Sequence, residues 1–223
     1  MKKLLLSLML AAAGLTASAQ TSPVKFGLRA GATFPKLSIS EDAEGAVKMS
    51  TSFYVGGTVD FSLNEMFSLQ PGLTVLGKGT KLKISQEIIE EDFEGTLDGT
   101  GTVHLLYVEV PLNIVARFPV GNGKLFVGAG PYYAMGINGE QKIKATITVG
   151  DQAESDSGYE DLEFGKDGDY KRSDVGLNFL AGYELSKGIN IQAGYGLGLT
   201  NINQQGNVTI KNNVLSVGLG YRF

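Results

Sequence analysis

The chain has no cysteine, no tryptophan and a single histidine among its 223 residues. The lack of cysteine excludes disulfides, thiolate metal sites and a lipid-modified N-terminal cysteine. Beyond residue 19, no stretch approaches the roughly eighteen consecutive apolar residues that indicate a transmembrane helix. The net charge is −4, which argues weakly against nucleic acid as a partner. These absences remove thiol chemistry and helical membrane anchoring from the functions to consider.

The N-terminus has the features of a secretory signal peptide. A basic start is followed by an apolar run from residue 4 to about residue 15, and a group of small residues ends at Ala19. This pattern predicts that residues 1–19 are a cleaved signal peptide and that residues 20–223 form one mature domain. A mean hydropathy of +0.03 fits a soluble secreted domain. It also fits a transmembrane β-barrel, because the lumen-facing residues of such a barrel are polar.

The last ten residues alternate between two kinds of side chain. The large apolar set comprises Leu215, Val217, Leu219, Tyr221 and Phe223. The other, mostly small or polar set comprises Val214, Ser216, Gly218, Gly220 and Arg222. Because successive side chains of a strand point to opposite faces, this pattern predicts a strand with an apolar outer face. The ending resembles the C-terminal strand of bacterial outer-membrane β-barrels, so Tyr221 and Phe223 are the predicted signal for the barrel assembly machinery.

Seven earlier segments show the same alternation. They span residues 24–34, 52–63, 67–76, 105–118, 125–137, 175–185 and 189–200. Together with the last strand they predict an all-β fold, an eight-stranded antiparallel transmembrane up-and-down β-barrel. The connections alternate between long and short. Since outer-membrane barrels have short periplasmic turns, both termini are predicted to be periplasmic and the protein to lie in the bacterial outer membrane.

Local signals predict where the strands end or break. Proline lacks a ladder donor, so Pro35 is expected to end the first strand and Pro71 to cause a bulge or local break. The Gly-Asn-Gly at 121–123 predicts a type I′ hairpin turn. The polar stretch at 87–98 predicts a strand that protrudes from the membrane and then a loop. The acidic stretch at 138–173 predicts a long loop.

The outward aromatic residues give a check on this orientation, because they should collect at the two membrane interfaces. The periplasmic girdle is predicted to comprise Phe26, Phe61, Phe67, Phe118 and Tyr183, together with Tyr221 and Phe223. Phe34 and Phe53 fall at the external end. The strand assignment therefore produces an aromatic girdle that it did not assume.

The inward positions carry a set of charges. The predicted lumen charge network comprises Lys25, Arg29, Asp60, Glu109, Arg117, Glu184 and Arg222. At membrane depth such groups must pair or meet water, and eight strands leave little lumen. We therefore expect ion pairs inside a filled barrel rather than a substrate path. The expected pairs are Arg29 with Glu109, Lys25 with Asp60, and Arg117 with Glu184.

Several segments resemble the PorT-like outer-membrane β-barrel family. They read KFGLRAGATF near the start, YVEVPLNIVARF and FVGAGPYYAMGI in the middle, and LGYRF at the end. The resemblance covers most of the mature chain and implies an eight-stranded barrel in the outer membrane of a Gram-negative bacterium. Some members of the family assist protein secretion. The resemblance brings no catalytic motif.

Three features could carry chemistry. His104 is the only histidine, and a His-Ser pair serves catalysis in outer-membrane lipid deacylases, but no third group is identifiable here. The glycines at 194, 196 and 198 lie within a strand, where they fit closure of a narrow barrel better than a phosphate-binding loop. The acidic residues around Asp167-Gly168-Asp169 could hold calcium, but their spacing does not match an EF-hand, and a solvated loop is favoured.

The sequence as a whole predicts a non-enzymatic outer-membrane barrel without cofactors or metal. Its role would be structural, or accessory to the envelope or protein secretion through external loops. The predicted partners are outer-membrane lipid and lipopolysaccharide, the barrel assembly machinery and an envelope or secretion protein. The alternatives are a porin-like conduit for small solutes or apolar ligands, and a lipid-modifying outer-membrane enzyme. A soluble lipocalin-like barrel is disfavoured, because its outer face would be polar.

Overall fold

The computed structural model describes residues 24–39, 47–90, 93–149, 152–204 and 208–223. The predicted signal peptide lies outside these residues. The described part consists of strands and loops, and it contains no helix able to cross a membrane. The strands are β1 (Val24–Ile39), β2 (Val47–Lys48), β3 (Ser52–Ser62), β4 (Phe67–Glu90), β5 (Phe93–Val120), β6 (Gly123–Val149), β7 (Gln152–Asp161), β8 (Ser173–Leu185), β9 (Ile189–Gly198) and β10 (Ile210–Arg222).

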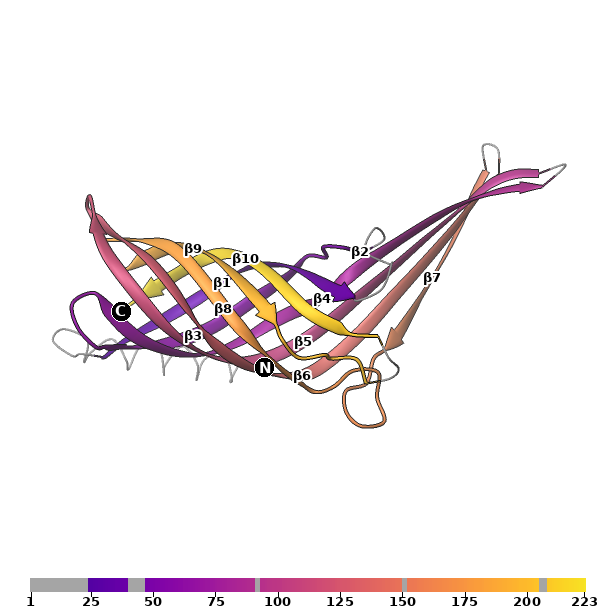
Figure 1. Ribbon diagram of the computed structural model, residues 1–223. Helices are drawn as coiled ribbons and strands as arrows, with labels where there is room; N and C mark the ends of the chain where they lie inside the picture. The colour runs from indigo at the N-terminus through magenta and orange to yellow at the C-terminus, as the bar shows by residue number, and fades with distance from the viewer. Residues whose placement is uncertain (1–23, 40–46, 91–92, 150–151, 205–207) are drawn as a thin grey trace, which may run out of the picture.

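Eight of these strands close into an antiparallel ring (Figure 1). The order is β1-β3-β4-β5-β6-β8-β9-β10, and β10 pairs with β1 to complete it. The short strand β2 adds to β4, and β7 adds to β6, both outside the ring. The predicted eight-stranded up-and-down barrel is therefore confirmed.

The two ends of the barrel differ. At one end, here called the turn end, short connections join β3 to β4, β5 to β6 and β8 to β9, and β10 finishes beside the start of β1. At the other end, the sheet end, β4, β5, β6 and β7 continue far beyond the ring as a projecting sheet (Figure 1). The pairings in this sheet extend to Glu90↔Phe93 and Val149↔Gln152.

The projecting sheet corrects the predicted loops. The stretch at 87–98 protrudes as expected, but apart from residues 91–92, which lie outside the described residues, it stays in strand. Much of the stretch at 138–173 is also strand, because β6 runs to Val149 and β7 folds back along it. Ladder hydrogen bonds to a neighbouring strand satisfy the backbone here, so the polar composition of these segments does not prevent a sheet.

Of the two prolines with predicted effects, Pro35 differs from expectation and Pro71 agrees with it. Strand β1 does not end at Pro35. Its ladder to β3 ends at Thr33↔Ser52, so that ladder needs no N–H from Pro35, whose carbonyl accepts from the Ser50 N–H at 3.0 Å while β1 continues beside β10. At Pro71 the β3–β4 ladder is interrupted between Thr58↔Gly72 and Phe61↔Leu69 without a register shift, which is the expected local break without a bulge.

The β5–β6 turn is tighter than predicted. Val120 pairs with Gly123, so the loop contains only Gly121 and Asn122. Gly121 has φ +57°, and no non-glycine residue in the described chain has a positive φ. A type I′ turn requires positive φ at both central residues, so the turn is not type I′; glycine at the first central position is the type II′ arrangement.

The outer wall of the barrel is apolar, as the alternation predicted. Leu73, Val110 and Leu219 are 58%, 49% and 61% exposed on the outward parity. The inward neighbours Thr74 and Glu109 are 3% and 4% exposed. A wall with this polarity is stable in lipid, where backbone groups must be paired and the outer side chains meet hydrocarbon.

Candidate functional site

The lumen at the turn end is filled by charged groups. Asp60 on β3 is 2% exposed, and its carboxylate accepts a hydrogen bond from Arg117 Nη2 on β5 at 2.6 Å. The same carboxylate accepts from Ser68 Oγ at 3.1 Å and from Gln70 Nε2 at 3.0 Å, both on β4. Three adjacent strands are therefore joined through one buried acid.

A second ion pair lies at the same height in the lumen, on the opposite wall of the barrel. Arg222 on β10 donates from Nε to Glu184 Oε2 on β8 at 2.7 Å, and its Nη2 contacts the other carboxylate oxygen. This two-point contact holds the guanidinium across the intervening strand β9. The cavity that remains among these residues has a volume of only about 30 Å³. That volume leaves room for little more than isolated waters.

The centre of the lumen is organised by Lys78 on β4, which is 1% exposed. Its Nζ lies 2.9 Å from Asp174 Oδ2 and 3.3 Å from Glu109 Oε2. The ammonium also lies 4.3 Å from the ring centroid of Tyr132 and 5.0 Å from that of Tyr107. Two carboxylates and two aromatic rings thus surround one buried cation.

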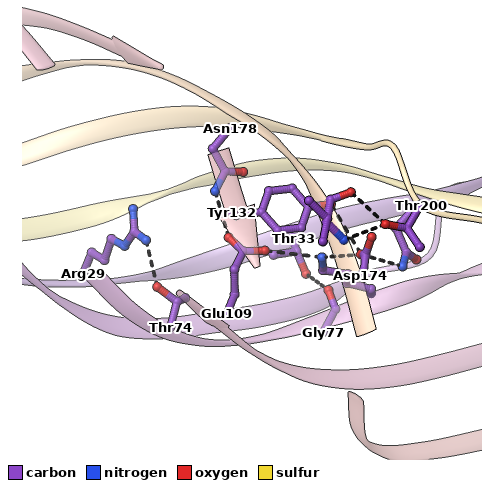
Figure 2. A network of polar contacts seen from close by, with 12 residues as sticks. Arg29, Thr33, Thr74, Gly77, Glu109, Tyr132, Asp174, Asn178 and Thr200 are labelled. Carbon is purple, nitrogen blue, oxygen red and sulfur yellow. Dashed lines mark hydrogen bonds and ion pairs between the residues drawn. The ribbon is translucent and has the colours of Figure 1, made fainter. Parts of the chain in front are cut away.

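The two carboxylates have further donors. Asn178 Nδ2 donates to Glu109 Oε1 at 2.8 Å, and Asn212 Nδ2 donates to Asp174 Oδ2 at 3.0 Å. Figure 2 shows Glu109 joined to Asn178 on one side and to the Asp174 cluster on the other. The central cluster therefore connects β4, β5, β8 and β10 across the lumen.

Two expected pairings are replaced by others. Arg29 donates to Thr74 Oγ1 at 2.7 Å rather than to Glu109, as the separate dashed contact in Figure 2 shows. Glu109 lies within electrostatic range of Arg29, but Lys78 takes the ion pair because it is anchored on β4, directly beside β5. Arg117 pairs with Asp60 on β3 rather than with Glu184 on β8; the two strands are equally far from β5 in the ring, but Arg222 already pairs with Glu184.

Lys25, like Arg29, is a predicted network member that forms no ion pair in the described chain. It lies directly opposite Asp60 in the β1–β3 ladder, but Asp60 is bound to Arg117. Lys25 instead lines the mouth of the turn end, beside Lys124, Lys187 and Phe223, around a cavity of about 610 Å³. There its ammonium can be solvated.

Sequence reasoning missed Lys78 and Asp174, although a signal for both was present. The third strand was expected to end near residue 76 and the sixth to begin at 175. Lys78 continues the inward parity of Ser68, Gln70 and Thr74, and Asp174 continues that of Asn178 and Glu184. Extending each strand by one inward position would have placed both charges in the lumen.

Tyr54 on β3 lies across the inner wall and fills the space above two glycines. A Cβ at Gly31 would lie 2.8 Å from the Tyr54 ring, and a Cβ at Gly218 would lie 2.3 Å from its hydroxyl. The Tyr54 hydroxyl accepts a hydrogen bond from Gln192 Nε2 at 3.1 Å. The glycines are required here because they let one ring lie flat over β1 and β10 and reach β9.

An apolar cap closes the lumen at the sheet end. A buried cluster includes Leu105, Tyr107 and Ile202, and Leu162, Phe164 and Tyr170 of the β7–β8 connection pack against it. The ring of Phe164 meets that of Tyr107 edge to face, with centroids 5.5 Å apart. Burial, with a contribution from Asp169, raises the pKa of Tyr170. The connection therefore folds inward as a plug.

The other candidate groups lie elsewhere. His104 is exposed on the outward face of β5, between Gly79 and Glu140 of the adjacent strands. Glycines 194, 196 and 198 line the inner face of β9; a Cβ at Gly198 would lie 2.4 Å from the Asn212 carbonyl oxygen. Asp169 accepts from the Glu163 N–H at 2.9 Å, and no group of three metal-binding side chains occurs within the described ranges.

The predicted girdle residues all lie at the turn end. Phe61, Phe67, Phe118 and Tyr221 are 43%, 41%, 38% and 42% exposed, whereas Phe26 and Tyr183 are half-buried. Phe223 donates its N–H to the Phe26 carbonyl at 2.9 Å, and its ring packs edge to face on Tyr221 at 4.9 Å. The last residue thus belongs to the closing seam between β10 and β1.

An apolar wall, a closed antiparallel ring and a charge-filled lumen together define a small transmembrane β-barrel of the outer-membrane type. The chain belongs to the family described as outer membrane protein beta-barrel domain, whose model matches residues 18–204. No curated protein is significantly similar in sequence.

Three solved structures of similar architecture are distant from this chain in sequence. Ail, the attachment invasion locus protein of Yersinia pestis, is 18% identical with a TM-score of 0.40, over 89% of this chain and 98% of that one. Neisserial surface protein A is 16% identical with a TM-score of 0.39, over 91% and 98%. The N-terminal barrel of Pseudomonas aeruginosa OprF is 11% identical with a TM-score of 0.37, over 92% and 100%. The family places the protein in the bacterial outer membrane.

Proposed function

We propose that this protein is a non-enzymatic, PorT-like component of the outer membrane that acts as an accessory to an envelope or secretion protein. The barrel anchors it, both termini are periplasmic, and the projecting sheet is the part that contacts the partner. This orientation puts the short turns in the periplasm and the long hairpins outside, as is usual for outer-membrane barrels.

The observation that carries the proposal is the inner face of the projecting sheet, the face that continues the lumen wall. Ile84 on β4 is 58% exposed, and Ile143 and Ile147 on β6 are each 47% exposed. Between them, β5 presents Gly99 and Gly101, and in the next row Leu97 pairs with Ile147, so the strip has no polar side chain on β5. Contiguous exposed apolar surface outside a membrane marks an interaction site, and a protein partner would remove it from water.

The filled lumen supports an accessory role over a conduit. Buried ion pairs occupy the turn end and the centre, and the Phe164 cap covers the sheet end. A solute would have to break all three layers to pass. The outward position of His104, with only Gly79 and Glu140 opposite it in the ladder, supports a non-enzymatic role over lipid modification.

Co-purification from outer membranes in mild detergent tests the proposal. The wild-type protein should retain a reproducible partner, and a variant with Ile84→Asn and Ile143→Asn should lose it. The matched control, Thr100→Asn with Thr102→Asn, changes the opposite face of the same sheet and should keep the partner. Absence of any reproducible partner, or its retention by the isoleucine variant, would overturn the accessory role.

A further inference from the structure

The outer face of the projecting sheet carries a different surface. In one row across the strands, Lys48 on β2 pairs with Lys81 on β4, which pairs with Thr102 on β5, which pairs with Lys142 on β6. Cross-strand partners project from the same face of a sheet, so these side chains are neighbours. The row ends at Tyr159 on β7.

A second row lies two residues further from the barrel. Lys83 on β4 pairs with Thr100, and Thr100 pairs with Lys144 on β6. With strands about 4.8 Å apart, lysines on β4 and β6 are separated by about 10 Å, and the two rows by about 7 Å. We call the five lysines of these two rows the lysine grid: Lys48, Lys81, Lys83, Lys142 and Lys144.

The lysine grid has no carboxylate partner. None of its five ammonium groups forms an ion pair within the described residues. Lys142 lies 5.0 Å from the ring centroid of Tyr159 instead. Among the described residues, the nearest acids on this face lie outside the two rows: Asp98, which accepts from Ser85 Oγ, on one side, and Glu140 and Asp161 on the other. Five neighbouring positive charges repel one another. A bound polyanion would neutralise this repulsion, so the grid should attract one.

In the proposed orientation, the grid also lies beside the outer leaflet, where the polyanion lipopolysaccharide is abundant. Its face continues the outward parity of β4, on which Val75 belongs to the lipid-facing wall and Lys81 follows six residues later. At about 2.5 Å of height per residue in a tilted strand, Lys81 lies about 15 Å beyond Val75. Because the grid faces away from the barrel axis, the sugar-phosphate headgroups of neighbouring lipids can lie against it, and long lysine side chains can reach them.

We propose that the lysine grid binds the phosphate groups of lipopolysaccharide in the outer leaflet. Lysine binds phosphate as a point charge, and grouped lysines beside a membrane are attracted to anionic headgroups. The threonine hydroxyls at 100 and 102 add donors between the two lysine columns. In this arrangement the ammonium groups take the place of the divalent cations that otherwise bridge neighbouring phosphates. The proposal rests on the proposed orientation only for its cellular setting, because purified protein tests the grid in either orientation.

The test measures binding of fluorescent rough-type lipopolysaccharide to the purified barrel in detergent with EDTA present. A variant carrying Lys81→Gln, Lys83→Gln, Lys142→Gln and Lys144→Gln should bind at least tenfold more weakly than wild type. The control carries the same change at lysines 124, 166, 171 and 187, so its net charge is identical, and it should bind like wild type. Heat-modifiable migration verifies that both variants are folded.

Four results would overturn the proposal. They are equal binding by the grid variant, equal loss by the control, undiminished binding of dephosphorylated lipopolysaccharide, and loss of wild-type binding in EDTA. A sulfated glycan that binds wild type while lipopolysaccharide does not would assign the grid to another polyanion and also overturn it. The expected affinity falls with ionic strength, because the contacts are exposed charge pairs.

Discussion

Lys78 is buried at membrane depth and is shared by Glu109 and Asp174. With Arg29 nearby, this level of the lumen holds two positive and two negative groups. The turn-end level also balances, with Arg117 and Arg222 against Asp60 and Glu184. Because each level is neutral, no uncompensated charge is left in the low-dielectric interior. Such a charge would be energetically costly.

Removing one charged side chain from such a level should therefore strongly destabilise the barrel. Lys78→Met is expected to lower the free energy of unfolding by about 3–5 kcal/mol, because it leaves buried carboxylates unpaired. Glu109→Gln in that background should recover part of the loss. Urea unfolding in lipid vesicles, followed by gel mobility, measures both effects.

A matched double-mutant cycle uses Arg29 in place of Lys78 as the partner of Glu109. Arg29 bonds to Thr74 and not to Glu109, so the Arg29→Gln and Glu109→Gln changes should couple more weakly than the Lys78 pair. Lys187→Met, at the solvated turn end, should be close to neutral. If the two cycles give equal coupling energies, the assignment of Glu109 to Lys78 is wrong.

At the scale of the element, β10 closes the ring. Thirteen of its residues pair with β1, from Gly27↔Arg222 to Ile39↔Ile210, and Phe223 adds one more backbone bond to Phe26. Until that seam forms, both strands have an open edge of unpaired backbone groups, which lipid does not tolerate. The closing strand and its last residue are therefore the sensitive part of assembly.

Deleting Phe223 should lower the amount of heat-modifiable barrel in the outer membrane. The deletion removes the Phe26 bond and the ring packed on Tyr221, in addition to the predicted assembly signal. Phe223→Tyr keeps an aromatic terminus and serves as the control. Wild-type yield from the deletion would show that the assembly machinery does not depend on this residue.

The molecule as a whole is a closed barrel that carries a long projecting sheet. Its stability lies in the ring and its filled lumen, whereas the surfaces available to partners lie on the two faces of the sheet. One face exposes Ile84, Ile143 and Ile147, and the other carries the lysine grid. In the proposed roles, membrane anchoring and partner binding are thus separated along the same strands β4, β5 and β6.

Planar bilayer recordings test the closed state. The intact protein should show no steady conductance, because charge pairs fill two levels and Phe164 packs on Tyr107 over the third. A porin-like conduit would instead conduct steadily. A stable open channel in the wild-type protein would contradict the filled lumen and restore the conduit hypothesis.

The sequence by itself determined the barrel. Alternation between apolar and polar side chains is a local property of each strand, and lipid on one side enforces it. It fixed eight strands, their inward and outward residues, and the inward position of Arg117, Asp60, Glu184 and Arg222. Beyond the barrel wall, in 93–98, 138–149 and 152–161, the polar composition predicts loops, whereas the structure has strands.

Only the tertiary structure decided which charges meet. Contacts across a lumen depend on ring closure and on the stagger between strands, and neither is encoded in any one segment. That geometry pairs Glu109 with Lys78 and Asp60 with Arg117, and it places Phe164 over the lumen at the sheet end. It also aligned lysines from β2, β4 and β6 into one grid, since cross-strand register brings together residues about 60 positions apart.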